Sequence, residues 1–140
     1  MELNLNTENT KPDIHRSRPI ILSIFCLFGF MYFSLLALLF ILATFYSGWI
    51  TEVTNKYVPA EAVTKAQVLL IFFTGALLHL VAFAGLVLLW NMRRTGYYLM
   101  GVPCLAVACY HLFQPGLSIS TAIIYILFII IFGFFFRRLR

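Results

Sequence analysis

Two histidines are the residues of this sequence with the clearest capacity for chemistry. His79 and His111 each lie within a long apolar stretch. Two imidazoles inside a membrane could bind a haem or a metal ion, or could relay protons. They could also be neutral groups that form hydrogen bonds between packed helices. The sequence favours this last role, because small residues accompany each histidine and small residues are typical of close helix contacts.

Carboxylates are absent from the apolar stretches. All five acidic residues lie outside them, namely Glu2, Glu8, Asp13, Glu52 and Glu61. Ionisable groups inside a bilayer usually mark a transport path, and no carboxylate is placed to bind a proton or a cation. This argues against the small multidrug exporters, which have a similar size but need a glutamate in the first span.

The cysteines also favour packing over chemistry. Cys26, Cys104 and Cys109 all fall in apolar stretches, and the last two are five positions apart, on different faces of a helix. Thiols alone do not make a zinc site, and a buried cysteine packs as a small apolar residue. The sequence contains no phosphate loop, nucleophile elbow or His-Glu-x-x-His motif. We therefore expect no enzyme activity, no catalytic residue, no cofactor and no bound metal.

The composition indicates that membrane helices carry these residues. Of the 140 residues, 62% are hydrophobic and only 11% are charged, whereas soluble domains average about 45–50% and about 25%. Three windows contain no charge, and they lie between residues 18 and 52, 65 and 93, and 94 and 137. As one helix the last window would be about 63 Å long, twice the thickness of the hydrocarbon core. It must therefore divide, and Gln114-Pro115-Gly116 is the natural break.

The predicted fold is accordingly an all-α membrane protein with four transmembrane helices. The expected spans are about 19–46, 67–91, 97–113 and 117–136, and they form a single domain over residues 19–140. Residues 47–66 are expected to form an outside loop. The second helix could begin earlier, at Val58-Pro59-Ala60-Glu61. Residues 1–18 are expected to be a disordered polar tail.

The basic residues predict the orientation of the helices. With four spans, both termini and the loop near residue 93 share one side. That side carries eight basic residues, namely Lys11, Arg16, Arg18, Arg93, Arg94, Arg137, Arg138 and Arg140, and the other side carries Lys56 and Lys65. Cytoplasmic loops hold an excess of Lys and Arg, so both termini are predicted to be cytoplasmic. We expect the arginines to contact anionic lipid head groups and not nucleic acid. The small size and short loops favour a bacterial inner membrane.

Small residues predict which helix faces pack together. The stripe on the second span is Gly75, His79, Ala82 and Gly85, and the stripe on the third is Gly101, Cys104, Ala108 and His111. A short loop at 91–96 makes these spans antiparallel neighbours, so the two stripes are expected to face each other or the bundle centre. The relative depth of His79 and His111 stays open. Other polar residues could join them near the outer side, namely Thr74, Tyr110, Gln114, Ser118, Thr121 and Tyr125.

The layout of the chain resembles that of small bacterial four-helix membrane proteins of unknown function. The residues that carry the resemblance are Arg18-Pro19 before the first span, Trp90 with Arg93-Arg94 at the inner hairpin, and Gly96-Tyr97 at the start of the third span. The resemblance implies a membrane-embedded fold. It brings no catalytic residue.

Three functional hypotheses follow. The first is a non-catalytic accessory subunit that joins a larger membrane complex, or a copy of itself, through apolar helix faces. An Ile- and Phe-rich fourth span suits contact with lipid or with such a partner. The second is a small homo-oligomeric carrier or channel with a polar path near His79 and His111. The third is a redox protein or enzyme that uses the two histidines, and the absence of catalytic motifs makes it the weakest.

Overall fold

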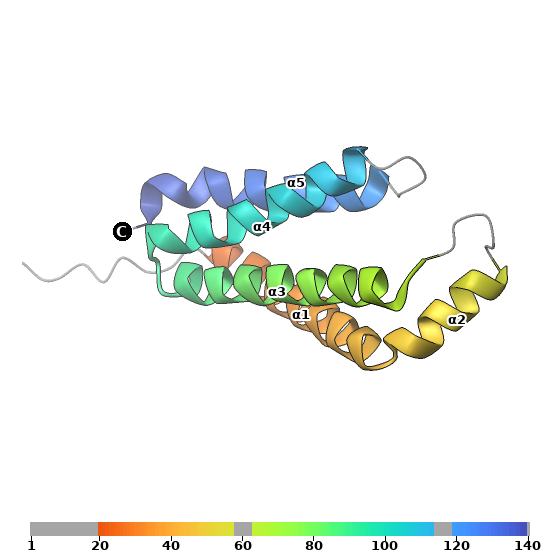
Figure 1. Ribbon diagram of the computed structural model, residues 1–140. Helices are drawn as coiled ribbons and strands as arrows, with labels where there is room; N and C mark the ends of the chain where they lie inside the picture. Colours follow the sequence, from red (N-terminus) through yellow and green to blue (C-terminus); the bar gives the residue numbers. More distant parts are fainter. Residues whose placement is uncertain (1–19, 58–62, 114–118, 140) are drawn as a thin grey trace, which may run out of the picture.

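The computed structural model describes residues 20–57, 63–113 and 119–139, and every regular element in these ranges is helical (Figure 1). In chain order these are α1 (Ile20–Phe45), α2 (Ser47–Tyr57), α3 (Lys65–Trp90), α4 (Arg94–Phe113), α5 (Ile119–Phe135) and a short 3₁₀ turn, η2 (Phe136–Arg138). The all-α prediction is confirmed. The predicted tail at 1–18 and the alternative helix start at Val58-Pro59-Ala60-Glu61 lie outside the described residues.

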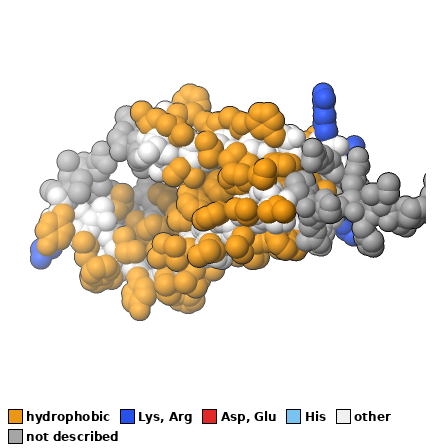
Figure 2. Space-filling view, turned by 180° about the vertical axis from the view of Figure 1, so that it is seen from behind, with side chains coloured by type: hydrophobic (Ala, Val, Ile, Leu, Met, Phe, Trp, Pro, Cys, Tyr) orange, Lys and Arg blue, Asp and Glu red, His pale blue; other side chains and the backbone are white. Residues whose placement is uncertain are grey.

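Three of these helices, α1, α3 and α4, are long and apolar enough to cross a membrane. With 26 residues each, α1 and α3 extend about 39 Å, which exceeds the hydrocarbon thickness of about 30 Å. The apolar helix α5 is shorter, at 17 residues. Figure 2 shows hydrophobic side chains over the middle of one face of the molecule and Lys and Arg side chains at its two ends. This distribution is that of a membrane protein.

The helices pack in the order α1, α3, α4, α5, with each beside the next (Figure 1). Aromatic rings connect α1 to α5. The rings of Tyr32 and Phe128 stack at 5.7 Å between centroids, and Phe33 lies 5.3 Å from Phe128. The buried core includes Leu22, Cys26, Phe33, Ala82, Leu86, Leu89, Met100, Cys104, Ala108, Ala122, Tyr125 and Phe132. One face of α5 therefore packs in the core of this chain, and the rest of the helix is partly or fully exposed.

Two glycines allow α3 and α4 to touch through their backbones. A Cβ added to Gly85 would lie 2.5 Å from the backbone nitrogen of Met100, and one added to Gly96 would lie 2.6 Å from the carbonyl oxygen of Gly85. Real Cβ atoms do not approach backbone this closely, so only glycine fits at both positions. Gly85 therefore lies directly against the backbone of α4. Gly96 also belongs to this contact between α3 and α4, although it was not part of the small-residue stripe predicted on the third span.

Gly101 departs from the predicted stripe. A Cβ added to Gly101 would meet nothing within 4 Å. Gly101 therefore makes no close helix contact with the described part of the chain. Gly101 and Cys104 are three positions apart, so they lie on the same face of α4. The close contact between α3 and α4, however, is made by Gly85, Gly96 and Met100, and Gly101 is not part of it.

The turn between α3 and α4 is shorter than predicted. It spans residues 91–93, and α4 begins at Arg94 instead of near Tyr97. Arg93 N–H donates to Leu88 C=O, and Met92 N–H donates to Leu89 C=O. These two bonds form a Schellman motif, in which the residue after the cap is normally glycine. Here that residue is Met92, with φ of 59°, and its side chain packs against the core.

The predicted outside loop at 47–66 contains a helix. The 11-residue α2 follows α1 with only Tyr46 between them, and hydrogen bonds continue across this residue, from Tyr46 N–H to Leu42 C=O and from Ile50 N–H to Tyr46 C=O. Ser47-Gly48 thus marks a bend and not the end of helical structure. In Figure 1, α2 runs at an angle to α1, at the end of the bundle away from the C-terminus.

Side-chain hydrogen bonds hold the segment that leads into α3. The Asn55 amide bonds both the N–H and the C=O of Val63, at 2.8 and 3.0 Å. Thr64 then caps α3, because its hydroxyl accepts from Gln67 N–H while the Gln67 side chain accepts from Thr64 N–H. This capping box fixes the start of the helix at Lys65.

The opposite end of the bundle gathers the turn at 91–93 and the C-terminal turn η2. Arg94 Nε donates to Leu139 C=O at 2.9 Å, and the Arg94 guanidinium lies 5.9 Å from the centre of the Phe136 ring. Leu139 is itself buried. The turn at 91–93 and the turn η2 therefore lie at the same end of the bundle.

A candidate site around His79 and His111

His79 is buried and bridges two helices. Its Nδ1 lies 2.6 Å from Gly75 C=O on its own helix α3, and its Nε2 lies 2.6 Å from the Tyr125 hydroxyl on α5. A carbonyl oxygen can only accept, so Nδ1 carries the proton. In a neutral ring Nε2 is then the acceptor, and Tyr125 donates its O–H to it. The geometry therefore specifies one tautomer and the direction of both bonds.

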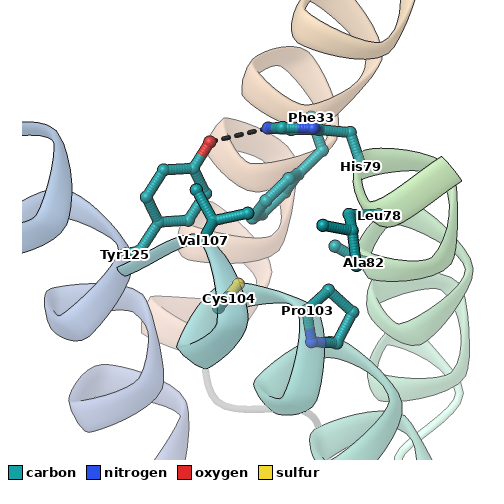
Figure 3. A pocket seen from close by; sticks show the side chains of 8 residues that line it. All are labelled: Phe33, Leu78, His79, Ala82, Pro103, Cys104, Val107 and Tyr125. Atoms are coloured by element: carbon teal, nitrogen blue, oxygen red, sulfur yellow. Dashed lines mark hydrogen bonds between the residues drawn. The ribbon is translucent and has the colours of Figure 1, made fainter. Parts of the chain in front are cut away.

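The histidine and the tyrosine meet in a dry part of the core. His79 is 3% exposed and Tyr125 is 2% exposed. Figure 3 shows their hydrogen bond together with the surrounding side chains of α1, α3 and α4, among them Phe33, Cys104 and the in-helix proline Pro103. The gap that these side chains enclose has no room for a water molecule. Both ring nitrogens of His79 are satisfied by protein groups.

This bonding has a consequence for metal or haem ligation. Both ring nitrogens of His79 are engaged, so coordination through either would break a short hydrogen bond. Among the described residues no group of three or more His, Cys, Asp or Glu side chains is arranged to hold a metal ion. In the structure His79 forms hydrogen bonds with two groups of its own chain. Its interhelical partner comes from α5 and not from the facing stripe on α4.

Next to this bond lies a cavity of about 370 Å³. Its walls come from α3, α4 and Phe40 of α1, and both His79 and His111 line it. The ring of Phe40 stacks on that of His79, with 5.1 Å between centroids. The two histidines, which the sequence left at uncertain relative depth, therefore share one cavity. The remaining polar residues of its wall are Thr74 and Tyr110.

His111 differs from His79 in having an unsatisfied atom. Its Nδ1 is buried and has no hydrogen-bond partner among the described residues. The Tyr110 ring lies edge-on to it at 6.0 Å. Buried polar atoms are nearly always paired in folded proteins, so an exception calls for an explanation. A ligand atom in the adjoining cavity would provide one.

The other predicted packing residues are distributed over two contacts. Gly75 faces α1, because an added Cβ would lie 2.7 Å from the Phe40 ring. Ala82, Cys104 and Ala108 are each 1% exposed in the common core. None of the three cysteines forms a disulfide; Cys26 and Cys104 are buried, and Cys109 is partly buried.

Two residues of the site carried weak sequence signals. Tyr125 appeared only as one of several polar residues near the outer side, because the sequence does not reveal which helix lies beside His79. Pro103 lies within α4 and lines the dry gap. Gln114 and Ser118 lie outside the described residues, as do Arg16, Arg18 and Arg140. Arg138 belongs to η2, and the structure describes its backbone only.

A second hollow lies on the opposite side of α3, between α1 and α3. It measures about 180 Å³ and is lined by Ser34, Ala37, Leu38, Ile41, Leu80 and Phe83. Ser34 and Ala37 provide its small side chains. Ser34 is exposed, and its hydroxyl is bonded to Met31 C=O on its own helix. The hollow is therefore an apolar surface with its polar atom already satisfied.

No protein-family model, curated protein or solved structure matches this chain. The resemblance to small bacterial four-helix membrane proteins is therefore not confirmed.

Proposed function

We propose that this protein is a non-catalytic accessory subunit of a larger membrane complex. In this proposal the chain crosses a bacterial inner membrane four times with both termini in the cytoplasm. The apolar helix α5 supplies the fourth crossing. The excess of basic residues near the 91–93 turn and the chain ends supports the orientation. The arginines at that end would contact anionic lipid head groups.

The observation that supports the accessory role best is the hollow between α1 and α3. Membrane helices associate through close packing, and small residues at the contact let the backbones approach. Ser34 and Ala37 supply such residues one turn apart, and Leu38, Ile41 and Leu80 form an apolar rim. A large side chain from a partner helix would fit between them. The partner is a larger membrane protein or a second copy of this chain.

Filling this hollow is expected to remove the partner. In Ser34→Trp an indole would occupy the hollow, and the exposed position of Ser34 lets the chain fold normally. Leu35→Trp is the matched control, because Leu35 is 58% exposed on the next face of α1 and does not line the hollow. After mild-detergent purification from the native membrane, mass spectrometry should find a stoichiometric membrane partner with the wild type and Leu35→Trp. With Ser34→Trp its yield should fall at least tenfold. Equal recovery with all three chains would contradict this interface.

A second candidate function is a small carrier, supported by the cavity shared by His79 and His111. In that case, vesicles containing the protein should show proton flux, followed with a pH-sensitive dye inside the vesicles. Ala106→Phe would place a ring in the cavity wall and should abolish the flux. Flux equal to that of protein-free vesicles would rule out the proton-carrier form of this role.

A further inference from the structure

The cavity beside His79 has the dimensions and walls of a small-molecule site. Its volume of about 370 Å³ lies within the roughly 300–1,000 Å³ typical of ligand pockets. Most of its lining is apolar, and its few polar groups come from α3 and α4. Such a combination, an apolar wall with a small number of polar groups, is what ligand sites usually show.

The polar groups of the wall are not equivalent. His79 has both ring nitrogens occupied, by Gly75 C=O and by the Tyr125 hydroxyl. His111 has a buried Nδ1 without a partner among the described residues. Leaving such an atom unpaired in an apolar setting is unfavourable. His111 is therefore the wall residue that would gain most from a hydrogen-bonding ligand, and Tyr110 adds a hydroxyl beside it.

The charge of the wall limits the ligand further. None of the described residues that line the cavity is Asp, Glu, Lys or Arg. An ion transferred there would lose its hydration without gaining a counter-charge, so a neutral ligand is favoured. The cavity also reaches the apolar outer surface, because two of its lining residues, Leu70 and Tyr110, are 67% and 47% exposed. In a membrane this surface faces lipid, and a lipid-soluble molecule would have direct access.

We infer that the cavity binds a neutral, lipid-soluble molecule whose polar group is a carbonyl or hydroxyl oxygen, held by a hydrogen bond from or to His111. The apolar body of the ligand would lie along the α3 and α4 walls, against Phe40 and Leu78. This site is separate from the hollow between α1 and α3, so it does not depend on the accessory role. It shares residues with the carrier proposal but requires no transport. Binding without flux would retain this inference and remove the carrier.

The test compares three probes that differ at a single carbon. Phenyl decyl ketone, the corresponding alcohol and undecylbenzene share one apolar skeleton and carry a carbonyl, a hydroxyl or no oxygen. Each is added to the purified full-length protein in lipid nanodiscs whose histidines are labelled with ¹⁵N. We expect saturable binding of the ketone or the alcohol at least tenfold tighter than that of undecylbenzene. We also expect a shift of the His111 Nδ1 resonance.

Variants of the cavity wall test whether the probes bind in this cavity and whether His111 holds their oxygen. His111→Phe should bring the affinity of the oxygen-bearing probe down to that of undecylbenzene, and Ala106→Phe should weaken all three by filling the cavity. Leu105→Phe is the matched control, because Leu105 is 56% exposed next to Ala106 and does not line the cavity. Equal affinity of the three probes for the wild type would mean apolar filling only and would overturn the inference. Unchanged binding to folded His111→Phe would do the same.

Discussion

Replacing Gly85 with alanine is expected to lower the free energy of unfolding by about 1–3 kcal/mol, the usual cost of overpacking a close contact. The new methyl group would lie 2.5 Å from the backbone nitrogen and 2.9 Å from the Cα of Met100. Backbone atoms cannot rotate away as a side chain can, so α4 must move as a whole. Gly85→Leu should have a still larger effect and prevent the α3–α4 pair from forming.

Gly101→Ala provides the matched control. It makes the same chemical change on the neighbouring helix, where the added Cβ meets nothing within 4 Å. Its stability should equal or slightly exceed that of the wild type, because alanine is the better helix former. Unfolding by sodium dodecyl sulfate in mixed micelles, followed by circular dichroism, measures both variants. Equal stability of Gly85→Ala and Gly101→Ala would show that the α3–α4 contact is wrongly placed.

Removing the Tyr125 hydroxyl is expected to cost about 1 kcal/mol, within the range measured for hydrogen bonds between membrane helices. In Tyr125→Phe the ring and its contacts stay, but His79 Nε2 loses its donor at 2.6 Å. The gap enclosed by Phe33, Cys104 and Pro103 beside the pair has no room for a water molecule that could replace the hydroxyl from that side. The variant should keep the fold with a weaker attachment of α5.

The same unfolding titration measures this effect, and ¹⁵N spectra of His79 provide an independent readout. The wild type should show a protonated Nδ1 and an Nε2 that accepts a hydrogen bond, and the Nε2 resonance should move in Tyr125→Phe. Tyr98→Phe is the control, because Tyr98 is 60% exposed on α4. If Tyr125→Phe left the stability and the His79 resonances as in the wild type, the proposed bond would be absent in solution.

Much of the helical layout could be predicted from the sequence. Long uncharged windows demand helices, because only a helix satisfies every backbone group of a continuous apolar segment in lipid. The predicted spans at 19–46, 67–91, 97–113 and 117–136 accordingly lie within three residues of α1, α3, α4 and α5 at every end. The errors occur at the connections. The stretch 47–57 is too polar to be a membrane span, so we expected a loop, but helical hydrogen bonding continues from α1 past Tyr46 into α2.

The sequence by itself determined the residue types available for function, namely histidines without carboxylates inside apolar helices, small residues in stripes, and arginines near the predicted ends. It did so because burial of charge and close approach of helices restrict residue types strongly. Only the tertiary structure decided the pairings. Helical periodicity shows which residues share one face of a helix, but it does not show which other helix packs against that face. Thus Gly85 lies against the backbone of Met100, whereas a Cβ added to Gly101 would meet none of the described atoms within 4 Å. Likewise, His79 bonds to Tyr125, 46 residues further along the chain, whereas the Nδ1 of His111 has no partner among the described residues.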